Sequence, residues 1–366
     1  MHFYCKQELL INSINIVLKA CSTKTSFQIL ECIYLKTNNS TLTLVGNNLE
    51  LGIESTLNAN ILKEGSVAIE SKIFSEIIKK MPNNEIEIYS DENNIVTIRC
   101  ENSEFIIKGK LGKEFPDLPQ LTTSTGYNLL QSNLKEMIKQ TIFSISQEES
   151  KITFNGELIE LKEGIFRIIA TDGFRMAYRE MPLEITTTNI QSAIVPGKTL
   201  TEISRILSND DNLVTIYFEK NYIMFDIGNS KIISRLLDGE FVKYEQIFLN
   251  NYNTRIKIDK RKILLSLERA ELISRDGKNN PVKFEITNDL IIISSDAELG
   301  SVREEVKINL EGDKFIIAFN PKYLIEVLKV IDDQIITIDF VSPLHPCIIH
   351  SEEKKYKYLI LPVRLN

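Results

Sequence analysis

The sequence predicts an α+β protein made of three tandem copies of one unit, each with two amphipathic helices packed on an antiparallel sheet. A helical segment with a leading lysine recurs at 71–79, 197–205 and 321–329, with spacings of 198 − 72 = 126 and 322 − 198 = 124 positions. An alternating strand pattern follows each helix, at 86–89, 214–218 and 336–340. Short hairpins join most strands, which disfavours a parallel sheet with crossover helices.

Further segments keep the same register. An earlier helix of each copy ends at 21–22, 145–146 and 273–274, and a Glu-Phe pair recurs at 114–115 and 240–241. The chain is therefore interpreted as three units of about 122 residues (366/3), each with two helices and about eight strands. The predicted domains are 1–122, 123–250 and 251–366, with boundaries in the polar stretches 121–126 and 249–254.

Composition excludes several classes of protein. With 366 residues and 43% hydrophobic residues, the chain can bury a large core. It has no apolar stretch long enough to span a bilayer and no signal-peptide pattern, and its five scattered cysteines are typical of a reducing cytoplasm. No nucleotide-binding loop, nucleophile motif or metal-ligand spacing is present, so we expect no cofactor, no metal, no catalytic residue and no enzyme activity.

The stretch 171–177 predicts a β-hairpin turn, because Asp172-Gly173 lies between two apolar strands. Asn48 and Asp296 are expected at the same place in the other copies, since 172 − 48 = 124 and 296 − 172 = 124. In the middle copy alone, the turn displays an aromatic residue beside an arginine, Phe174-Arg175. An enzyme that uses Asp172 is the alternative for this stretch, but no partner acid, base or metal ligand accompanies it.

A basic residue follows each leading lysine by seven positions, which puts both on one helix face. The pairs are Lys72/Lys79, Lys198/Arg205 and Lys322/Lys329, and the apolar residues Ile73, Phe74 and Ile77 are expected on the opposite face. An ordinary solvated face is the alternative for any one helix. Repeated in several helices of a chain with net charge −7, the pattern favours a basic surface that attracts phosphates without reading bases, so any DNA bound there would be bound without sequence specificity.

The threefold repeat combines with four motifs, Thr171–Ala177, Arg235–Phe241, Phe319–Tyr323 and Leu361–Leu365. Together they resemble the bacterial DNA polymerase III beta subunit family, the sliding clamps. The resemblance covers the whole chain and implies three DNA-clamp domains, a ring formed by a head-to-tail homodimer, and a processivity function in the cytoplasm. The implied partners are duplex DNA, the replicative polymerase alpha-type subunit, a clamp loader, and repair polymerases and ligase-type proteins that dock through linear motifs. A scaffold that never encloses DNA is the competing hypothesis.

The resemblance also implies a peptide-binding groove between the second and third domains. Its residues would be Phe154, Thr171, Gly173, Phe174, Arg175, Met176, Val242, Ile247, Asn320, Tyr323, Leu344, Pro346, Leu359, Leu361, Pro362, Val363 and Arg364. The chain departs from the family's usual His, Pro and Met at Phe174, Val242 and Leu361.

The same resemblance assigns DNA contacts to Lys24, Lys151 and Lys198, which join Lys72, Lys79 and Arg205 of the helical pattern. Candidates for the dimer junction are Phe105, Ile107, Leu272 and Ile273, for which ordinary core packing is the open alternative.

Overall fold

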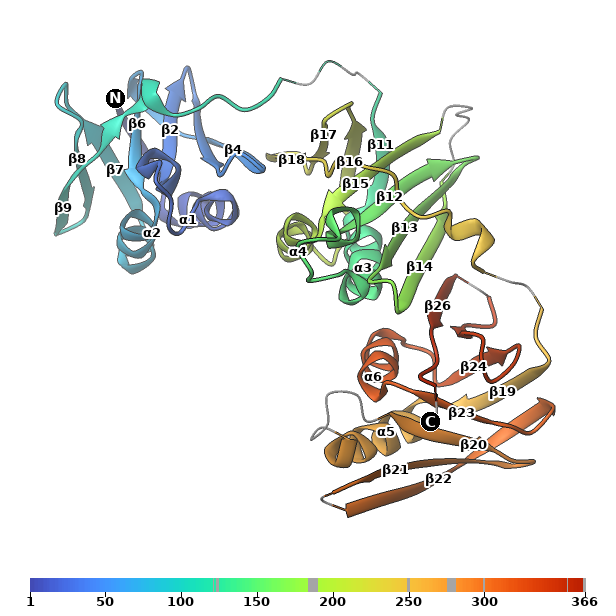
Figure 1. Ribbon diagram of the computed structural model, residues 1–366. Helices are drawn as coiled ribbons and strands as arrows, with labels where there is room; N and C mark the ends of the chain where they lie inside the picture. The colour runs from blue at the N-terminus through green and yellow to red at the C-terminus, as the bar shows by residue number, and fades with distance from the viewer. Residues whose placement is uncertain are drawn as a thin grey trace. The chain divides into compact units, whose positions relative to one another are not determined.

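The structure is a computed structural model that describes residues 1–120, 122, 125–183, 190–248, 251–274, 281–298, 300–353 and 355–364. Within these residues there are six α-helices, two in each predicted copy (Figure 1). They are α1 (Gln7–Val17), α2 (Ser71–Lys80), α3 (Gln131–Thr141), α4 (Gly197–Ile206), α5 (Lys260–Ser274) and α6 (Pro321–Val330). The predicted helix pairs are confirmed. The predicted boundary positions 121, 123, 124, 249 and 250 lie outside the described residues.

The chain divides into two compact units. The first comprises Met1–Lys135 and Glu202–Leu236. It holds a five-stranded sheet in the order β5 (Asn60–Lys63), β1 (His2–Lys6), β7 (Glu85–Ser90), β8 (Ile95–Cys100), β9 (Ser103–Lys108). It also holds a nine-stranded sheet in the order β10 (Lys110–Leu111), β6 (Gly65–Glu70), β2 (Cys32–Asn38), β3 (Thr41–Asn47), β4 (Leu51–Asn58), β18 (Ser230–Arg235), β17 (Tyr222–Asp226), β16 (Leu213–Phe218), β11 (Tyr127–Leu130).

The second unit comprises Glu136–Thr201 and Leu237–Asn366. Its twelve-stranded sheet runs in the order β15 (Gln191–Pro196), β12 (Gly156–Lys162), β13 (Ile165–Thr171), β14 (Arg175–Pro182), β26 (Tyr356–Ile360), β25 (Cys347–His350), β24 (Ile335–Phe340), β19 (Thr254–Asp259), β22 (Gly300–Gly312), β21 (Leu290–Ala297), β20 (Val282–Ile286), β23 (Ile316–Phe319). Neighbouring strands pair antiparallel in both units, as predicted.

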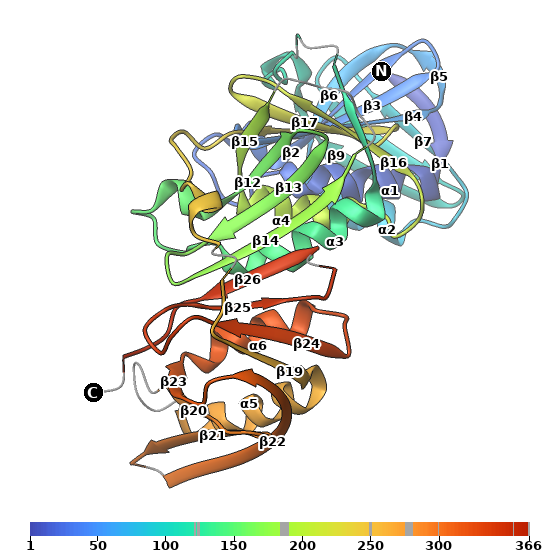
Figure 2. The ribbon, with the colours of Figure 1, turned by 90° about the vertical axis from the view of Figure 1, so that its right-hand side faces the viewer.

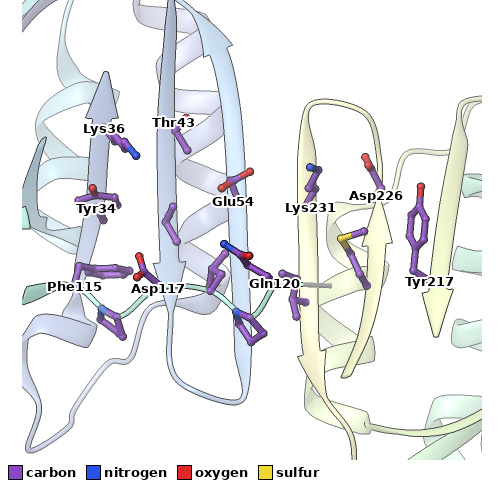
Figure 3. A pocket seen from close by; sticks show the side chains of 16 residues that line it. Tyr34, Lys36, Thr43, Glu54, Phe115, Asp117, Gln120, Tyr217, Asp226 and Lys231 are labelled. Carbon is purple, nitrogen blue, oxygen red and sulfur yellow. The ribbon is translucent and has the colours of Figure 1, made fainter. Parts of the chain in front are cut away.

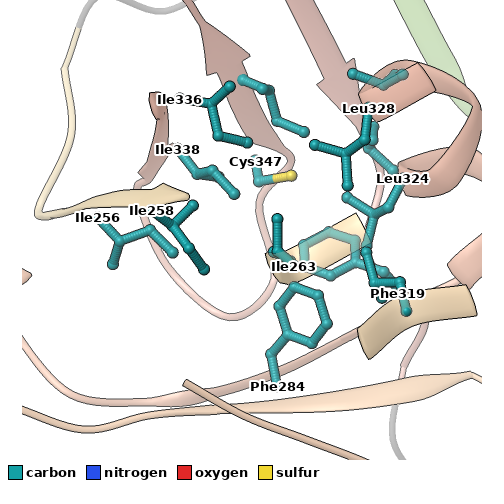
Figure 4. Close-up of a cluster of buried hydrophobic side chains, with 14 of the residues drawn as sticks. Ile256, Ile258, Ile263, Phe284, Phe319, Leu324, Leu328, Ile336, Ile338 and Cys347 are labelled. Atoms are coloured by element: carbon teal, nitrogen blue, oxygen red, sulfur yellow. The ribbon is translucent and has the colours of Figure 1, made fainter. Parts of the chain in front are cut away.

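The third copy shows how the helices pack. Helices α5 and α6 bury Ile263 and Leu324 against strand residues such as Phe284, Phe319 and Ile338 (Figure 4). Complete burial of a side chain of this size stabilises the fold by about 1.5–3 kcal/mol. No helix in the described part of the chain is long and apolar enough to cross a bilayer.

Helix α2 begins where the Glu70 carboxylate accepts hydrogen bonds from the amides of Lys72 and Ile73. Phe74 and Ile77 are buried, as predicted for an amphipathic helix. The prediction for Ile73 was wrong, since its side chain is 45% exposed. Ile73 lies one position before Phe74 and is therefore turned by about 100° around the helix, away from the core.

Two strand pairs join successive copies, and we call them the first and second seams. In the first seam β4 pairs with β18, and Leu51 lies opposite Ser234. In the second seam β14 pairs with β26, which lie side by side in Figure 2, and Arg175 lies opposite Ile360. Each seam therefore sets the first residue of the strand after the turn against the fifth residue of the joining strand. The two seams share one register, which is the threefold repeat expressed as strand pairing.

The expected equivalence of the three turns holds for two of them. The Asp172 carboxylate accepts hydrogen bonds from the amides of Phe174 (2.8 Å) and Arg175 (3.1 Å). The side-chain Oδ1 atom of Asn48 accepts them from the amides of Glu50 (3.0 Å) and Leu51 (2.8 Å). The expectation for Asp296 was wrong. Asp296 lies within β21 and pairs with Ser301, because the ladder of this hairpin continues to Ala297 and Gly300.

Candidate functional site: the turn at the second seam

The hairpin between β13 and β14 presents the residues that the sequence singled out. Gly173 has φ +92, a conformation that favours glycine, and this lets the chain turn within Asp172–Phe174. Behind the turn, the Thr171 hydroxyl donates to the Arg175 carbonyl (2.7 Å) and is itself buried. The turn projects Phe174 outward, 51% exposed, so an aromatic ring is offered to solvent at the end of a rigid hairpin.

Arg175 is held within the protein and is only 7% exposed. Its guanidinium donates to the Asp172 carboxylate (3.0 Å), to the Phe143 carbonyl (2.5 Å) and to the Glu326 carboxylate of α6. It also lies over the Tyr323 ring at 4.6 Å and near the Phe143 ring at 5.3 Å. The guanidinium is thus occupied by the chain's own groups and fixes the turn against α6.

Residues at the start of α6 form the wall beside Arg175. The Asn320 side chain caps the helix by accepting from the Lys322 amide (3.0 Å), and Pro321 occupies the first helical position. Burial raises the pKa of Tyr323, and the Asp172 carboxylate raises it further. The Tyr323 phenol therefore stays protonated and keeps a hydrogen to donate at neutral pH.

The end of the chain extends the second seam. Beyond β26, the Leu361 amide donates to the Phe174 carbonyl (2.9 Å), and the Val363 amide donates to the Ala318 carbonyl of β23 (2.8 Å). The segment 361–363 is thereby tied both to the turn and to the third copy. Residues 365 and 366 of the predicted tail lie outside the described residues.

An apolar cluster forms the floor of this region. Of the predicted groove residues, Met176, Leu359 and Val242 belong to it. The sequence reasoning missed its other members, and the alternating pattern of β12, β13, β14 and β15 would have found Leu158, Ile169, Tyr178 and Ile194. The remaining members follow β18 outside the strands: Leu237, Phe241, Tyr244 and Phe248. Tyr178 packs against Tyr244 and Phe248 with ring centroids 5.9 and 5.5 Å apart.

The remaining predicted groove residues come from several segments. Phe154 packs edge-on against Phe241 at 6.3 Å. Ile247 (37% exposed) follows the short helix η6 (Tyr244–Gln246), and Leu361 is also 37% exposed. Leu344 (76% exposed) and Pro346 lie in the connection between β24 and β25, while Pro362 and Arg364 lie in the tail. Exposed apolar side chains around a buried apolar floor are the arrangement that accepts a short peptide.

The predicted DNA-contact residues are on the surface, but two of them are engaged. Lys24, Lys72, Lys79 and Lys198 are exposed. Arg205 is bound to Glu202 of the same helix. Lys151 lies at the turn, with its ammonium 5.4 Å from the Phe174 ring centroid and 3.2 Å from Glu148.

The dimer candidates are not ordinary core, which was their open alternative. Phe105 (43% exposed) and Ile107 lie on β9, at one edge of the five-stranded sheet. Leu272 (61% exposed) and Ile273 lie in the last turn of α5. Within the described residues, no group of three His, Cys, Asp or Glu side chains is placed to hold a metal ion.

Comparison with known proteins identifies the family. Residues 1–119, 128–243 and 245–364 match the models of the N-terminal, central and C-terminal domains of the DNA polymerase III beta subunit. The chain is 32% identical to the beta sliding clamp of Halalkalibacterium halodurans, over the whole length of both. It superposes on crystal structures of the Bacillus subtilis sliding clamp (31% identity, TM-score 0.97) and of the Streptococcus pyogenes beta subunit (31%, 0.96), in each case over 100% of both chains. The chain belongs to the DNA polymerase III beta subunit family, the beta sliding clamps.

Proposed function

We propose that this chain works as a DNA sliding clamp, a non-catalytic processivity factor that encircles duplex DNA and tethers a DNA polymerase. One observation carries the conclusion: all three clamp domains are matched in order, over residues 1–119, 128–243 and 245–364. The two seams of identical register that join the copies support it. The mechanism is topological. A closed ring leaves DNA slowly although each phosphate contact is weak, and no sequence is read.

The ring requires a third seam, which we propose to be a head-to-tail contact between two copies of this chain. Strand β9 ends the five-stranded sheet, and β22 starts after a hairpin as β4 and β14 do. Along the stretch that pairs with β21, no second strand within the described residues pairs with β22. The edge of β9 and the first part of β22 are therefore both free to pair with another strand. Pairing β9 of one copy with β22 of another, at both ends of a dimer, closes the ring.

The seam register specifies this contact residue by residue. The fifth residue of β9 is Ile107 and the first of β22 is Gly300, so these two would face each other. Glu104 would then face Arg303, as Lys231 faces Glu54 in the first seam. Opposite charges across adjacent strands support the register.

Exposed apolar residues on two helices support the same contact. Leu272 of α5 has its counterparts in Ala20 and Ser144, which are buried. Ile73 of α2 corresponds to Thr199 and Tyr323 of α4 and α6, which are less exposed. Leu272 and Ile73 are therefore the apolar residues that a partner copy would cover.

For DNA we propose the exposed lysines of the second helices, Lys72, Lys79 and Lys198, together with Lys24. Arg205 and Lys151 would contribute only if they leave Glu202 and Glu148, so we expect them to be weaker contacts.

For polymerase and other partner peptides we propose the groove around Phe174, Tyr323 and Leu361. Phe174 and Leu361 offer apolar contact, and the Tyr323 hydroxyl offers a donor. Because Arg175 is occupied, we infer that it positions the turn and does not bind the peptide. A clamp loader, repair polymerases and ligase-type partners, a cytoplasmic location, and domain limits of 1–122, 123–250 and 251–366 complete the proposal.

The experiment that tests the topological function loads the protein onto nicked circular DNA with a clamp loader and ATP. Linearising the DNA is expected to release the protein, while nicked circles keep it through gel filtration. Retention on linear DNA equal to that on circles would exclude encirclement and favour the scaffold hypothesis.

A further inference from the structure

A pocket of about 800 Å³ lies over the first seam. Its floor is the face of β2, β3, β4, β18, β17 and β16, and the segment 115–120 crosses one end (Figure 3). Tyr34 and Phe115 stand on one side, with their rings stacked at 5.4 Å, and Tyr217 stands on the other side. Met224, which pairs with Tyr217 across β16 and β17, also lines the pocket. The volume is in the range of pockets that hold a ligand, and none of the functions proposed above uses it.

The same place over the second seam is filled by the chain's own aromatic rings. Tyr178 on β14 packs against Tyr244 (5.9 Å) and Phe248 (5.5 Å). The Lys357 ammonium on β26 lies 5.6 Å from the Tyr178 ring centroid and 5.8 Å from that of Phe248. A lysine over aromatic rings at this distance is a favourable cation–π contact.

Two substitutions between the copies leave the first pocket open. Lys231 faces Glu54 across the first seam as Lys357 faces Tyr178 across the second, so Glu54 takes the place of a tyrosine. Counting from the shared phenylalanines Phe115 and Phe241, Leu118 takes the place of Tyr244. Leu118 also lies flat on β4, because it packs directly over Gly52: a Cβ added to Gly52 would be 2.3 Å from the Leu118 Cδ2 atom. In the second seam, Met176 takes the place of Gly52.

Lys231 occupies the position equivalent to Lys357, but it has no counterparts of the Tyr178 and Phe248 rings beside it. Within the described residues, no aromatic ring lies beneath the Lys231 ammonium. The pocket is larger than one ring, and its lining carries charges of both signs: Lys36, Glu54, Asp117 and Asp226. Glu54 and Asp226 lie opposite Lys231 on the two neighbouring strands. Room for neighbouring residues and charges for their side chains favour a peptide over an isolated aromatic compound.

We propose that this pocket is a second peptide-docking site, which takes an aromatic side chain of a partner protein beside Lys231, while the Tyr34–Phe115 stack at one side of the pocket contacts a neighbouring residue of the same peptide. The incoming ring supplies the contact that Tyr178 and Phe248 supply in the second seam. The two seams would then take different peptides, because the groove at the second seam presents its own exposed ring, Phe174, and the first pocket lacks a ring of its own.

The test uses the full-length protein labelled with ¹³C at its Met and Ile methyl groups, and the peptide acetyl-Glu-Phe-Lys-amide. Saturable shifts of the Met224 and Ile233 methyl signals are expected, with the Met176 methyl signal in the second seam unchanged. Peptides with alanine or cyclohexylalanine in place of Phe are the matched controls. Lys231→Met is expected to weaken binding of the Phe peptide by about two- to fivefold, the usual size of an exposed cation–π contact.

A double variant, Glu54→Tyr with Leu118→Tyr, places the second seam's tyrosines in the first pocket. It is expected to abolish the peptide-induced shifts of the Met224 and Ile233 signals. Its fold is checked by near-ultraviolet circular dichroism; where it does not fold, the Lys231→Met titration decides. The proposal is overturned by unresponsive Met224 and Ile233 methyl signals at millimolar peptide, by equal shifts with the alanine peptide, by unchanged binding in Lys231→Met, or by binding to a folded double variant.

Discussion

The first and second seams have the same backbone and different side chains. Both ladders set the first residue of the strand after the turn against the fifth residue of the joining strand. In the first seam that first residue is Leu51, which is buried and apolar, and in the second it is Arg175. Glu202 of α4 pairs with Lys19 at 3.6 Å, whereas Glu326 of α6 pairs with Arg175. The comparison shows that the repeat fixes register and spacing, while individual side chains decide what each seam can bind.

The largest expected difference between the seams is in how much their ion pairs contribute to the free energy of unfolding. Arg175→Met would leave the Asp172 and Glu326 carboxylates without their cation in a nearly closed site, and it should cost about 3 kcal/mol in the free energy of unfolding. Lys19→Met removes a more exposed pair and should cost at most about 1 kcal/mol. Urea unfolding of both variants measures the contrast. Equal losses would mean that the Arg175 site is no more than a surface ion pair.

A buried residue near the start of the second strand of the middle copy predicts a pH dependence. Glu157, the second residue of β12, is fully buried where the first copy has Ile33, and burial raises its pKa to about 8. The native state therefore holds a proton that the unfolded state releases near pH 4.5.

The contribution of the protonated Glu157 carboxyl to the free energy of unfolding is complete below pH 4.5 and is lost as the pH rises through 8. Glu157→Gln should remove this slope, with a gain of about 1–3 kcal/mol at pH 8.5 if the buried amide is accommodated. Thermal unfolding from pH 5 to pH 9 provides the measurement, and Glu160→Gln on the same strand is a control. A variant that retains the wild-type slope would assign the pH dependence to other groups.

A further difference between the seams is expected at their turns, which contain Asp172 and Asn48. Phe174→Ala should weaken binding of a fluorescein-labelled peptide with a Gln and a Leu or Phe anchor by at least about tenfold, because it removes an exposed aromatic contact. Glu50→Ala, at the equivalent position of the first turn, should leave the affinity unchanged. Fluorescence anisotropy reports the binding, and unfolding should be unaffected in both variants. If both substitutions had the same effect, peptide binding could not be assigned to the second seam.

The smallest expected effect tests whether the two observed seams predict the third. Glu104→Arg and Arg303→Glu should each weaken the dimer, by roughly tenfold over the two contacts of a ring, because like charges would face each other. The double variant should recover most of the loss. Analytical ultracentrifugation measures the dissociation constant. Additive losses in the double variant would show that Glu104 and Arg303 are not opposite each other.

The sequence by itself determined the threefold repeat, the six helices and the antiparallel hairpins. These features depend on local periodicity and turn chemistry, and the Asp172 and Asn48 turns repeat because their side chains bond to the backbone within three residues. The error at Asp296 arose because spacing in the sequence does not reveal how far a ladder continues.

The tertiary structure alone decided which side chains remain available. Arg175 looked free in sequence, but Glu326 and Phe143 reach it from segments 151 and 32 positions away. The exposure of Ile73 and Leu272, the burial of Glu157 and the open pocket beneath Lys231 likewise depend on neighbours that are distant in the chain. Local patterns determine which elements form and in what order. Burial and side-chain pairing depend on contacts between residues far apart in the chain, and a single sequence does not show these contacts.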